Sequence, residues 1–342
     1  MRQVLLTCYG SAADVVLLTA AVRDLSLSHP NAFRIAVRTN YKQLWENNPH
    51  LGAMETESEC DYVECRYAEG PLSNSLPFHS LHAFRLLLCD RLGVPIKPFA
   101  FKGDLHLTDF EMHTNPLIEE ATGSADCRYW IIVTGGKKDR SVKLWETKRY
   151  QEIVDHFEDR VLFVQCGSDE ETDCHPALDR VVNLVGKSNI RQLLQLVYHA
   201  DGIVCPVSLF MHLAAAVPTK PGRVRTRPAV VIAGGREPAQ WEAYPNHQYL
   251  HRCGCLPCCD NGGCWCNTVQ VDPYDSKEEG KNCLFPVPTT GGRPIPKCMD
   301  MVTSRQVIRS IENYLRYDAF AWRAIHAPLP TAILAPPSEG AT

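Results

Sequence analysis

The chain has 342 residues, 45% of them hydrophobic, and a formal net charge of −4. This length favours two domains of ordinary size, and the charge excludes the strongly basic surface typical of nucleic-acid-binding proteins. No stretch approaches the ~18 apolar residues that a membrane span needs. Residues 1–3 lead directly into a short apolar run that is wrongly flanked for a signal peptide. We therefore expect a cytoplasmic protein without a transmembrane segment.

The first part of the chain alternates strand-like and helical patterns. Residues 4–8 and 33–38 are short apolar runs that predict strands, and residues 12–28 between them predict a helix. This arrangement suits a βαβ crossover. A further helix is expected over residues 80–92, where apolar side chains recur at helical intervals.

Residues 93–127 lack such a pattern, and we expect them to be irregular, with a linker over residues 115–126. A second alternating block follows. Its predicted elements are a strand over 129–133, a helix over 145–157, a strand over 160–165, a helix capped by Ser188, a strand over 203–205, a helix over 208–217 and a strand over 229–233. Thr303 and Gln306 form a plausible capping box for a last helix.

Two consecutive blocks of this kind predict an α/β fold with two doubly wound, mostly parallel sheets. Ligands of such sheets bind at the carboxyl ends of the strands, here most naturally between the domains. The expected divisions are an acceptor-side domain over residues 1–125, a donor-binding domain over 126–250, a cysteine-rich knuckle over 251–300, a helix over 301–326 and a tail over 327–342.

Eight of the sixteen cysteines lie between Cys253 and Cys298. Disulfides are rare in the cytosol, so this cluster favours a metal site over a disulfide framework, with redox-active thiols as the alternative. Tetrahedral thiolate ligation fits zinc or iron. More cysteines are present than four ligands require. The preferred ligands, which tie the knuckle to two distant segments, are Cys259, Cys264, Cys283 and Cys298, with Cys255 and Cys258 in reserve.

Five short segments resemble, in the same order, motifs of glycosyltransferase family nine, the ADP-heptose:lipopolysaccharide heptosyltransferases. They are Gly10 to Asp14, Asn47 to Leu51, Thr134 through Lys143 to Trp145, Phe210 to Ala216, and Gly234 to Tyr244. The resemblance covers most of residues 1–250 and implies the two-domain GT-B architecture. It also implies an inverting transfer of heptose or a similar sugar from an ADP-activated donor to a glycan or protein hydroxyl.

The resemblance assigns roles to two charged residues. Asp14 would be the general base that deprotonates the acceptor hydroxyl; the alternative is an acidic residue that stabilises the first turn of its helix. Lys143 would neutralise the departing diphosphate, together with backbone N–H groups at the start of the helix after Ser208; the alternative is a solvated surface lysine. The expected donor-binding residues are Gly10, Ser11, Thr134, Gly135, Gly136, Lys143, Ser208, Met211, His212, Gly235, Trp241 and Glu242.

Some of these residues also have purely structural interpretations. His212 lies on an alanine-rich helix and fits a core histidine equally well. Trp241 and Tyr244 fit buried aromatic packing. The basic segment over residues 219–228, which includes Lys220 and Arg227, fits either a phosphate contact or a solvated loop.

The chain departs from the family at two places. Before the motif histidine the family has Asp-Thr-Gly-Leu, whereas this chain has Val207 and Leu209 at the acidic and glycine positions. A side chain at residue 209 hinders close approach of the backbone to a phosphate. Three residues also separate Gly10 from Asp14, where the family has adjacent Gly and Asp. Two hypotheses therefore stand, an active transferase and a catalytically impaired GT-B protein that serves as a metal-stapled binding module.

The cysteine knuckle is similar, in position and in four-cysteine content, to the iron site of the bacterial autotransporter heptosyltransferases. By that analogy the metal would be structural, and the analogy allows a homo-oligomer. A closed four-thiolate site has no open position for substrate, which argues against catalysis by the metal itself.

Overall fold

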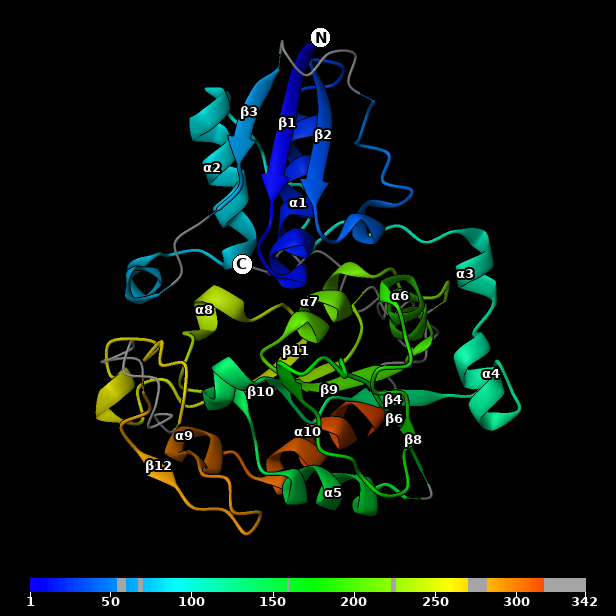
Figure 1. Cartoon of the computed structure of the whole chain (residues 1–342), viewed down its shortest axis with the longest axis vertical. Coiled ribbons are helices and arrows are strands. Elements are labelled where there is room, and N and C mark those ends of the chain that lie inside the picture. The colour runs from blue at the N-terminus through cyan, green and yellow to red at the C-terminus, as the bar shows by residue number, and fades with distance from the viewer. Residues whose placement is uncertain (54–59, 67–69, 159, 223–225, 270–281, 317–342) are drawn as a thin grey trace, which may run out of the picture.

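The structure of the protein is a computed structural model that describes residues 1–53, 60–66, 70–158, 160–222, 226–269 and 282–316. Figure 1 shows two α/β parts stacked along the long axis of the molecule, with the amino-terminal part in blue at the top. Within these residues, every helix falls short of the length and apolar character that a membrane crossing requires. The predicted tail over residues 327–342 lies outside the described residues.

The amino-terminal part is a three-stranded parallel sheet backed by helices. Strand β1 (Arg2–Cys8) lies between β2 (Phe33–Thr39) and β3 (Asp61–Glu64). Helix α1 (Ala12–Ser28) connects β1 to β2, and α2 (Ala83–Leu92) packs beside α1. The predicted βαβ unit is confirmed. Among the described residues, this part also contains three short 3₁₀ turns, η1 (Lys42–Trp45), η3 (Pro71–Ser75) and η4 (Ser80–His82).

Helix α1 is buried on nearly all sides because it packs between this sheet and the second part of the molecule. Its neighbour there is α7 (Leu209–Ala216). Gly103 lies between the two helices, and a Cβ at that position would be 2.8 Å from Val16 and 2.9 Å from Ala216. One continuous hydrophobic core therefore runs from β1 through α1 to α7.

The expectation of an irregular stretch over residues 93–127 is wrong. Helices α3 (Asp109–His113) and α4 (Pro116–Thr122) lie there and pack against α6 (Ile190–His199). Helix α3 begins with a capping box between Thr108 and Glu111, and Arg191 pairs with Glu111. The two helices are five and seven residues long, too short to produce an apolar periodicity in the sequence.

The second part contains a six-stranded parallel sheet in the order β11-β10-β9-β4-β6-β8. Its strands are β4 (Tyr129–Ile132), β6 (Leu162–Gln165), β8 (Val182–Asn183), β9 (Gly202–Pro206), β10 (Ala229–Gly234) and β11 (His247–His251). The chain runs outward from β4 to β8, returns to β9 beside β4, and then continues to β11. This is the doubly wound order of the dinucleotide-binding fold.

Helices cover both faces of this sheet, as the doubly wound prediction requires. Figure 1 shows α6 and α7 above it, facing the amino-terminal part, and α5 (Thr147–His156) with α10 (Ser304–Arg316) below it. A second hydrophobic core fills the lower face. The predicted capping box of α10 is confirmed, because Thr303 N donates to Gln306 Oε1 over 3.1 Å. The predicted cap of α6 is wrong, since Asn189 rather than Ser188 forms the box with Gln192.

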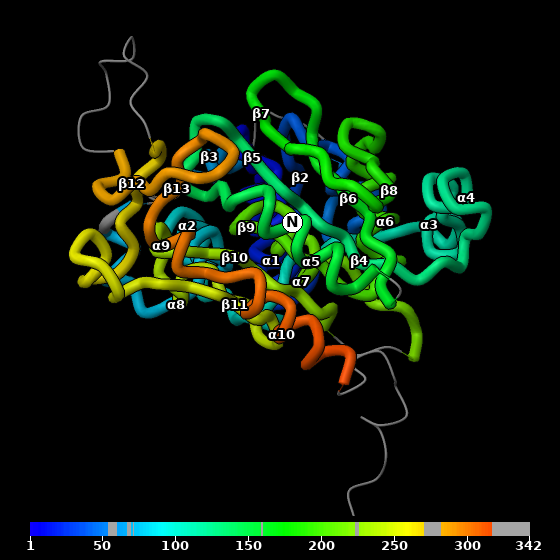
Figure 2. Tube along the Cα trace, turned by 90° about the horizontal axis from the view of Figure 1, so that it is seen from below, coloured from blue at the N-terminus to red at the C-terminus, as the bar shows by residue number. Residues whose placement is uncertain are grey.

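The cysteine-rich segment leaves the sheet after β11 and lies at one side of the molecule. Figure 2 shows its last elements on the side opposite to α3 and α4. The remaining short elements of the chain are β5 (Gly136–Lys137), η5 (Lys138–Lys143), β7 (Asp173–Cys174), α8 (Ala239–Glu242), η6 (Pro257–Cys259), β12 (Pro286–Val287), β13 (Ile295–Pro296) and α9 (Lys297–Asp300).

Candidate functional site

Two of the predicted donor-binding loops lie at the switch point of the six-stranded sheet. Thr134 and Gly135 follow β4, and Ser208 follows β9, the adjacent strand at which the order reverses. Crevices outside this point are where doubly wound sheets bind ligands. The topology therefore brings these two loops to one edge, although 73 residues separate Gly135 from Ser208 (208 − 135).

The loop after β4 is held closely by the strand pair β5–β7. A Cβ on Gly135 would lie 1.6 Å from the carbonyl oxygen of Cys174, so only glycine fits. Thr134 is buried; its hydroxyl donates to Pro176 O over 2.9 Å and accepts from Gln165 Nε2 over 2.8 Å. Gly136 has open space around its Cβ position. The backbone of this loop is therefore held in one conformation, and the Thr134 hydroxyl forms its hydrogen bonds with other residues of the protein.

Helix α7 starts at the carboxyl end of β9. Ser208 precedes it with an extended backbone, and its hydroxyl donates to Pro206 O over 3.1 Å instead of capping the helix. Met211 and His212, one turn further, are buried in the core. Leu209, at the position where the family has glycine, is partly buried against the same core. Met211 therefore serves packing here.

A cluster of histidine and aromatic rings joins the two parts of the molecule near α7. His212 Nδ1 lies 2.9 Å from the Tyr244 hydroxyl, and His212 Nε2 lies 3.7 Å from Glu242 Oε2. The ring of His79, from the amino-terminal part, packs 4.6 Å from that of Tyr244. Burial lowers the pKa of His79 to about 4 and holds that of His212 well below its ordinary value. Both rings are therefore neutral at pH 7.

The neighbouring aromatic residue of the predicted donor site is also buried. Trp241 is 1% exposed, and its ring lies 6.1 Å from that of Phe78 in the amino-terminal part. Glu242 is 7% exposed. The Trp241 ring therefore contributes to the contact between the two parts of the protein, while the Glu242 side chain lies beside His212.

Lys143 pairs with a carboxylate that the sequence did not point to. Its Nζ lies 2.6 Å from Glu237 Oε1, and the Glu237 side chain is 1% exposed whereas that of Lys143 is 24% exposed. Arg236 donates to the same oxygen of Glu237. Burial alone would raise the pKa of Glu237, but the charges and hydrogen bonds of Lys143 and Arg236 hold this pKa below its ordinary value. A buried carboxylate thus fixes the candidate diphosphate-binding ammonium group.

Asp14 forms a capping box at the start of α1. Its Oδ2 accepts from Ser11 N over 2.7 Å and from Ser11 Oγ over 2.8 Å. A Cβ on Gly10 would lie 2.5 Å from Asp14 Oδ2, so the glycine makes room for the carboxylate to fold back. The predicted residues Gly10, Ser11 and Asp14 therefore lie together. Asp14 caps the first turn of α1, a structural role that is compatible with a role as a base.

The basic segment after α7 contains a buried arginine, Arg227, that connects the ends of α6 and α7. Arg227 is 2% exposed, and its guanidinium donates to backbone carbonyls near the ends of α6 and α7. The five acceptors are the oxygens of Tyr198, Ala200, Ala214, Val217 and Pro218. Helix ends leave such carbonyls without partners, and this arginine satisfies them. The phosphate contact considered for Arg227 is therefore wrong, since the side chain is fully used inside the protein.

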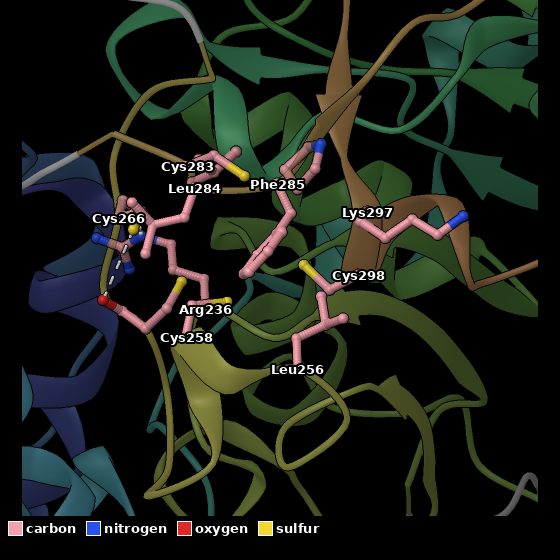
Figure 3. A pocket seen from close by; sticks show the side chains of 12 residues that line it. Arg236, Leu256, Cys258, Cys266, Cys283, Leu284, Phe285, Lys297 and Cys298 are labelled. Carbon is pink, nitrogen blue, oxygen red and sulfur yellow. Dashed lines mark hydrogen bonds between the residues drawn. The ribbon is translucent and has the colours of Figure 1, made fainter.

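Five cysteines from the cysteine-rich segment line one small cavity of about 10 Å³, a volume that suits a single ion or water molecule. Figure 3 shows four of them around this space, with the Lys297 side chain directed away from it. The cavity-lining cysteines are Cys258, Cys264, Cys266, Cys283 and Cys298. Three of the four preferred ligands and one of the two reserve ligands are therefore brought together.

Two of the predicted ligands lie elsewhere. The Cys259 thiol is directed to backbone oxygens, 3.4 Å from Leu256 O and 3.6 Å from Arg252 O, and Cys255 is exposed. Gly235, predicted to bind the donor, packs against this region, since its Cβ position lies 3.2 Å from Cys259 Sγ. Gly235 therefore lies at the carboxyl end of β10, against the cysteine segment.

The cavity-lining thiols influence one another electrostatically. A hydrogen bond from Cys266 lowers the pKa of Cys264 to about 7, while burial and the neighbouring thiols raise the pKa of Cys258 and Cys298 to about 12. The Cys264 thiol is therefore more readily ionised than the thiols around it. Across the described ranges of the chain, no three His, Cys, Asp or Glu side chains are arranged so that they could hold a metal ion.

The comparisons with known proteins agree with this arrangement. Residues 80–249 match the model of glycosyltransferase family 9 (heptosyltransferase). Residues 80–249 are therefore similar to a glycosyltransferase family 9 domain. The matched region contains the switch-point loops, Lys143 and Glu237, and from the histidine cluster it contains His212 and Tyr244. No curated protein matches the chain.

Solved structures show the same fold over the whole family 9 domain and beyond. A glycosyl transferase family 9 protein from Veillonella parvula is 13% identical, with a TM-score of 0.61 over 92% of this chain and 97% of that one. The ADP-heptose LPS heptosyltransferase II of E. coli is 14% identical, with a TM-score of 0.55 over 92% and 99%. The iron-containing dodecameric glycosyltransferase TibC from enterotoxigenic E. coli is 14% identical, with a TM-score of 0.60 over 92% and 76%.

The predicted α/β architecture of GT-B type is therefore confirmed. The residues that the sequence missed are Arg236 and Glu237. Both lie in the family-like segment between Gly234 and Tyr244. The sequence feature that could have indicated them is a charged pair that follows a buried strand and two glycines. Their partners lie far away in the chain, at Lys143 and Cys266, so spacing alone could not connect them.

Proposed function

We propose that the protein is an inverting glycosyltransferase that moves a heptose or a similar sugar from an ADP-activated donor to a glycan or protein hydroxyl. The observation that carries this proposal is the position of the Thr134–Gly136 and Ser208 loops at the switch point of a doubly wound sheet inside a family 9 domain. TibC, a relative in fold, has been solved in complex with ADP-D-beta-D-heptose. We place acceptor binding in residues 1–125 and donor binding in residues 126–250.

The proposed chemistry assigns one task to each group. The Asp14 carboxylate takes the proton of the acceptor hydroxyl as its oxygen attacks the anomeric carbon. Lys143 and the backbone N–H groups at the start of α7 neutralise the ADP that leaves from the opposite face. The capping bonds from Ser11 hold the Asp14 carboxylate in one orientation, which general-base catalysis requires.

The test is binding followed by transfer. Calorimetry with ADP, UDP and GDP should show selective binding of ADP. ADP-heptose should bind at the same site, and displacement of bound ADP-heptose by ADP would show this. Incubation of ADP-heptose with the protein should release ADP faster than buffer, and an Asp14→Asn variant that still binds ADP should release it at the buffer rate. Binding of no nucleotide by the folded protein would contradict the proposal.

A catalytically impaired GT-B protein is the second candidate, and a specific observation favours it. Lys143 is already paired with a buried carboxylate, and Leu209 replaces the glycine that would let a phosphate approach α7. The active transferase and the impaired protein differ in whether they transfer the sugar from the bound donor to an acceptor. ADP binding without transfer to any hydroxyl acceptor would support the binding module.

We propose a structural iron or zinc ion in the cysteine cavity. The residues fit this group in kind, because the cavity is of ionic size and its walls carry five sulfur donors. The ligands would be four cavity-lining cysteines, Cys258 from η6, Cys264 from the loop that follows, Cys283 from the stretch before β12, and Cys298 from α9. A closed thiolate site would supply folding free energy rather than catalysis. TibC is iron-containing and dodecameric, which supports a homo-oligomer here, and the thiol-rich cavity supports a reducing, cytoplasmic location.

A further inference from the structure

The position of Lys143 is fixed from two directions by the cysteine segment. The first connection runs through side chains. Arg236 Nε donates to Cys266 O over 2.8 Å and Arg236 Nη2 donates to Asn267 Oδ1 over 3.1 Å, while Nη1 donates to Glu237. Glu237 Oε1 in turn contacts Lys143 Nζ. A continuous series of charged contacts therefore leads from the backbone of the cysteine segment to the ammonium group.

The second connection runs through the backbone that precedes Lys143. Val142 N donates to Asn267 O over 3.2 Å, and Val269 N donates to Ser141 Oγ over 3.1 Å. The Val142 side chain packs with Cys266 and Val269 in a small apolar cluster of its own. The residues directly before Lys143 are therefore attached to the same segment, Cys266 to Val269, that Arg236 reaches.

Glu237 is buried more deeply than its role as a partner for a surface lysine requires. Its carboxylate is 1% exposed and lies beside two cations, both of which contact Oε1, while Oε2 has no hydrogen-bond partner among the described residues. Burying a charge is costly unless it is paired, so the Glu237 carboxylate depends on both cations and holds them close to it. An ammonium group has three N–H donors, so a Lys143 that gives one to Glu237 keeps two for another anion.

We propose that Glu237 is a positioning residue that holds Lys143 toward the donor diphosphate, and that Arg236 makes this position depend on the cysteine segment Cys266 to Val269. The inference rests on the proposed function, because it takes the diphosphate of an ADP-activated sugar as the second partner of Lys143. It adds a regulatory consequence. Any change that loosens the cysteine segment would lower donor affinity through the position of Lys143.

The experiment measures ADP affinity by calorimetry for a set of matched variants. Glu237→Ala and Arg236→Met should each weaken ADP binding about 10-fold, a factor that a lost charge-assisted contact commonly produces. Ser141→Ala should weaken it less, because one of the two connections remains. Glu237→Gln keeps the shape and an acceptor oxygen for Lys143, and it should restore most of the affinity that Glu237→Ala loses.

Arg149→Met is the control for the arginine variant. Arg149 also bonds a carboxylate and two backbone carbonyls, those of Asp300 and Val302, and its contacts among the described residues involve neither Lys143 nor Glu237. It should lower thermal stability and leave ADP affinity unchanged. For the transfer reaction, Glu237→Ala should raise KM for ADP-heptose more than it lowers kcat, since it disturbs binding before chemistry.

Three outcomes are distinguishable. Weaker ADP binding in Glu237→Ala and Arg236→Met, with unchanged binding in Arg149→Met, supports the inference. Unchanged or tighter ADP binding in Glu237→Ala, with wild-type protein binding ADP, overturns it and leaves the proposed function standing. A wild-type protein that binds no ADP overturns both. In every variant, Lys143 is labelled with an amine-reactive reagent and the labelling is measured by mass spectrometry. Increased labelling reports that the Lys143 ammonium group has been released from its partner. Unchanged labelling in Glu237→Ala would also contradict the inference.

Discussion

Asn74 and Trp265 join the amino-terminal part of the protein to the cysteine segment. Asn74 Oδ1 accepts from Trp265 Nε1 over 2.7 Å and from Gly263 N over 2.8 Å, and Asn74 Nδ2 donates to Gly263 O over 3.0 Å. A Cβ on Gly262 would lie 2.5 Å from the Asn74 side chain. One amide side chain therefore provides three hydrogen bonds across a contact between segments about 190 residues apart.

Replacing this amide should weaken the attachment. Asn74→Ala leaves the Trp265 and Gly263 groups without their partner, and we expect a loss of about 1–3 kcal/mol in the free energy of unfolding. Urea denaturation followed by tryptophan fluorescence measures it. Asn261→Ala is the control, because this exposed amide bonds only to Asp260 among the hydrogen bonds found here. Equal stability of the two variants would contradict the expectation.

Arg227 should be among the least replaceable residues of the second part. Arg227→Met removes the buried guanidinium and leaves five backbone carbonyls near the ends of α6 and α7 without their donors. We expect a loss of about 3 kcal/mol or more. Chemical denaturation of the variant beside Arg305→Met, which changes an exposed arginine, measures the difference. A loss below about 1 kcal/mol would mean that Arg227 is dispensable.

Acid should destabilise the protein through its buried histidines. Burial lowers the pKa of His79 to about 4 and that of His247 to about 3, from an ordinary value of 6.5. As the pH falls below 6.5, the unfolded chain takes up these protons first, so stability present at pH 7.5 is lost progressively between about pH 6.5 and 4. The shift at His79 corresponds to a contribution on the order of 3 kcal/mol.

Unfolding free energies at pH 7.5 and pH 5.0 measure this dependence. His247→Phe serves as the matched variant, because both ring nitrogens of His247 are buried without a hydrogen-bond partner in the described part of the chain, and the phenyl ring cannot be protonated. The variant should lose less stability between the two pH values than wild type. Identical losses would show that His247 does not contribute.

Metal content should follow the cavity rather than the order of cysteines in the sequence. Cys264→Ser and Cys298→Ser should reduce bound iron or zinc and lower the melting temperature, because both thiols line the cavity. Cys259→Ser and Cys127→Ser should retain the metal, since neither thiol lines it. Elemental analysis of purified protein gives the answer, and loss of metal in Cys259→Ser alone would favour the ligand set preferred from the sequence.

Lys143→Gln should weaken ADP binding by at least about 10-fold and reduce its dependence on salt, because it removes one unit charge beside the diphosphate. Lys187→Gln, in the turn before α6, is the control and should bind ADP as wild type does. Titrations at two salt concentrations measure both effects. Unchanged affinity in Lys143→Gln would remove this residue from the donor site.

The sequence predicted the long, apolar elements well. Helix α1 begins and ends at the expected residues, because a capping box opens it and a His-Pro pair follows it. The short polar helices α3 and α4 escaped prediction, since their stability comes from packing against α6 rather than from a pattern of their own. Strand β3 lies in a polar stretch and is defined only by its pairing with β1.

The site was predictable in outline but not in its partners. The order of the motifs placed Thr134, Lys143 and Ser208 in one domain. The pairing of Lys143 with Glu237 depends on two loops that are 94 residues apart (237 − 143). The sequence of neither loop indicates that the other is its partner. The same holds for Cys258 and Cys259. Adjacent thiols point in different directions, and only the folded backbone decides which one lines the cavity.

The shared core around Gly103 has a consequence for how this molecule comes apart. Its apolar side chains are contributed by β1, α1 and α7 together, so neither half can leave the other without exposing a surface that normally excludes water. We expect one cooperative melting transition rather than two, and a fragment that ends near residue 125 should aggregate instead of behaving as an independent unit.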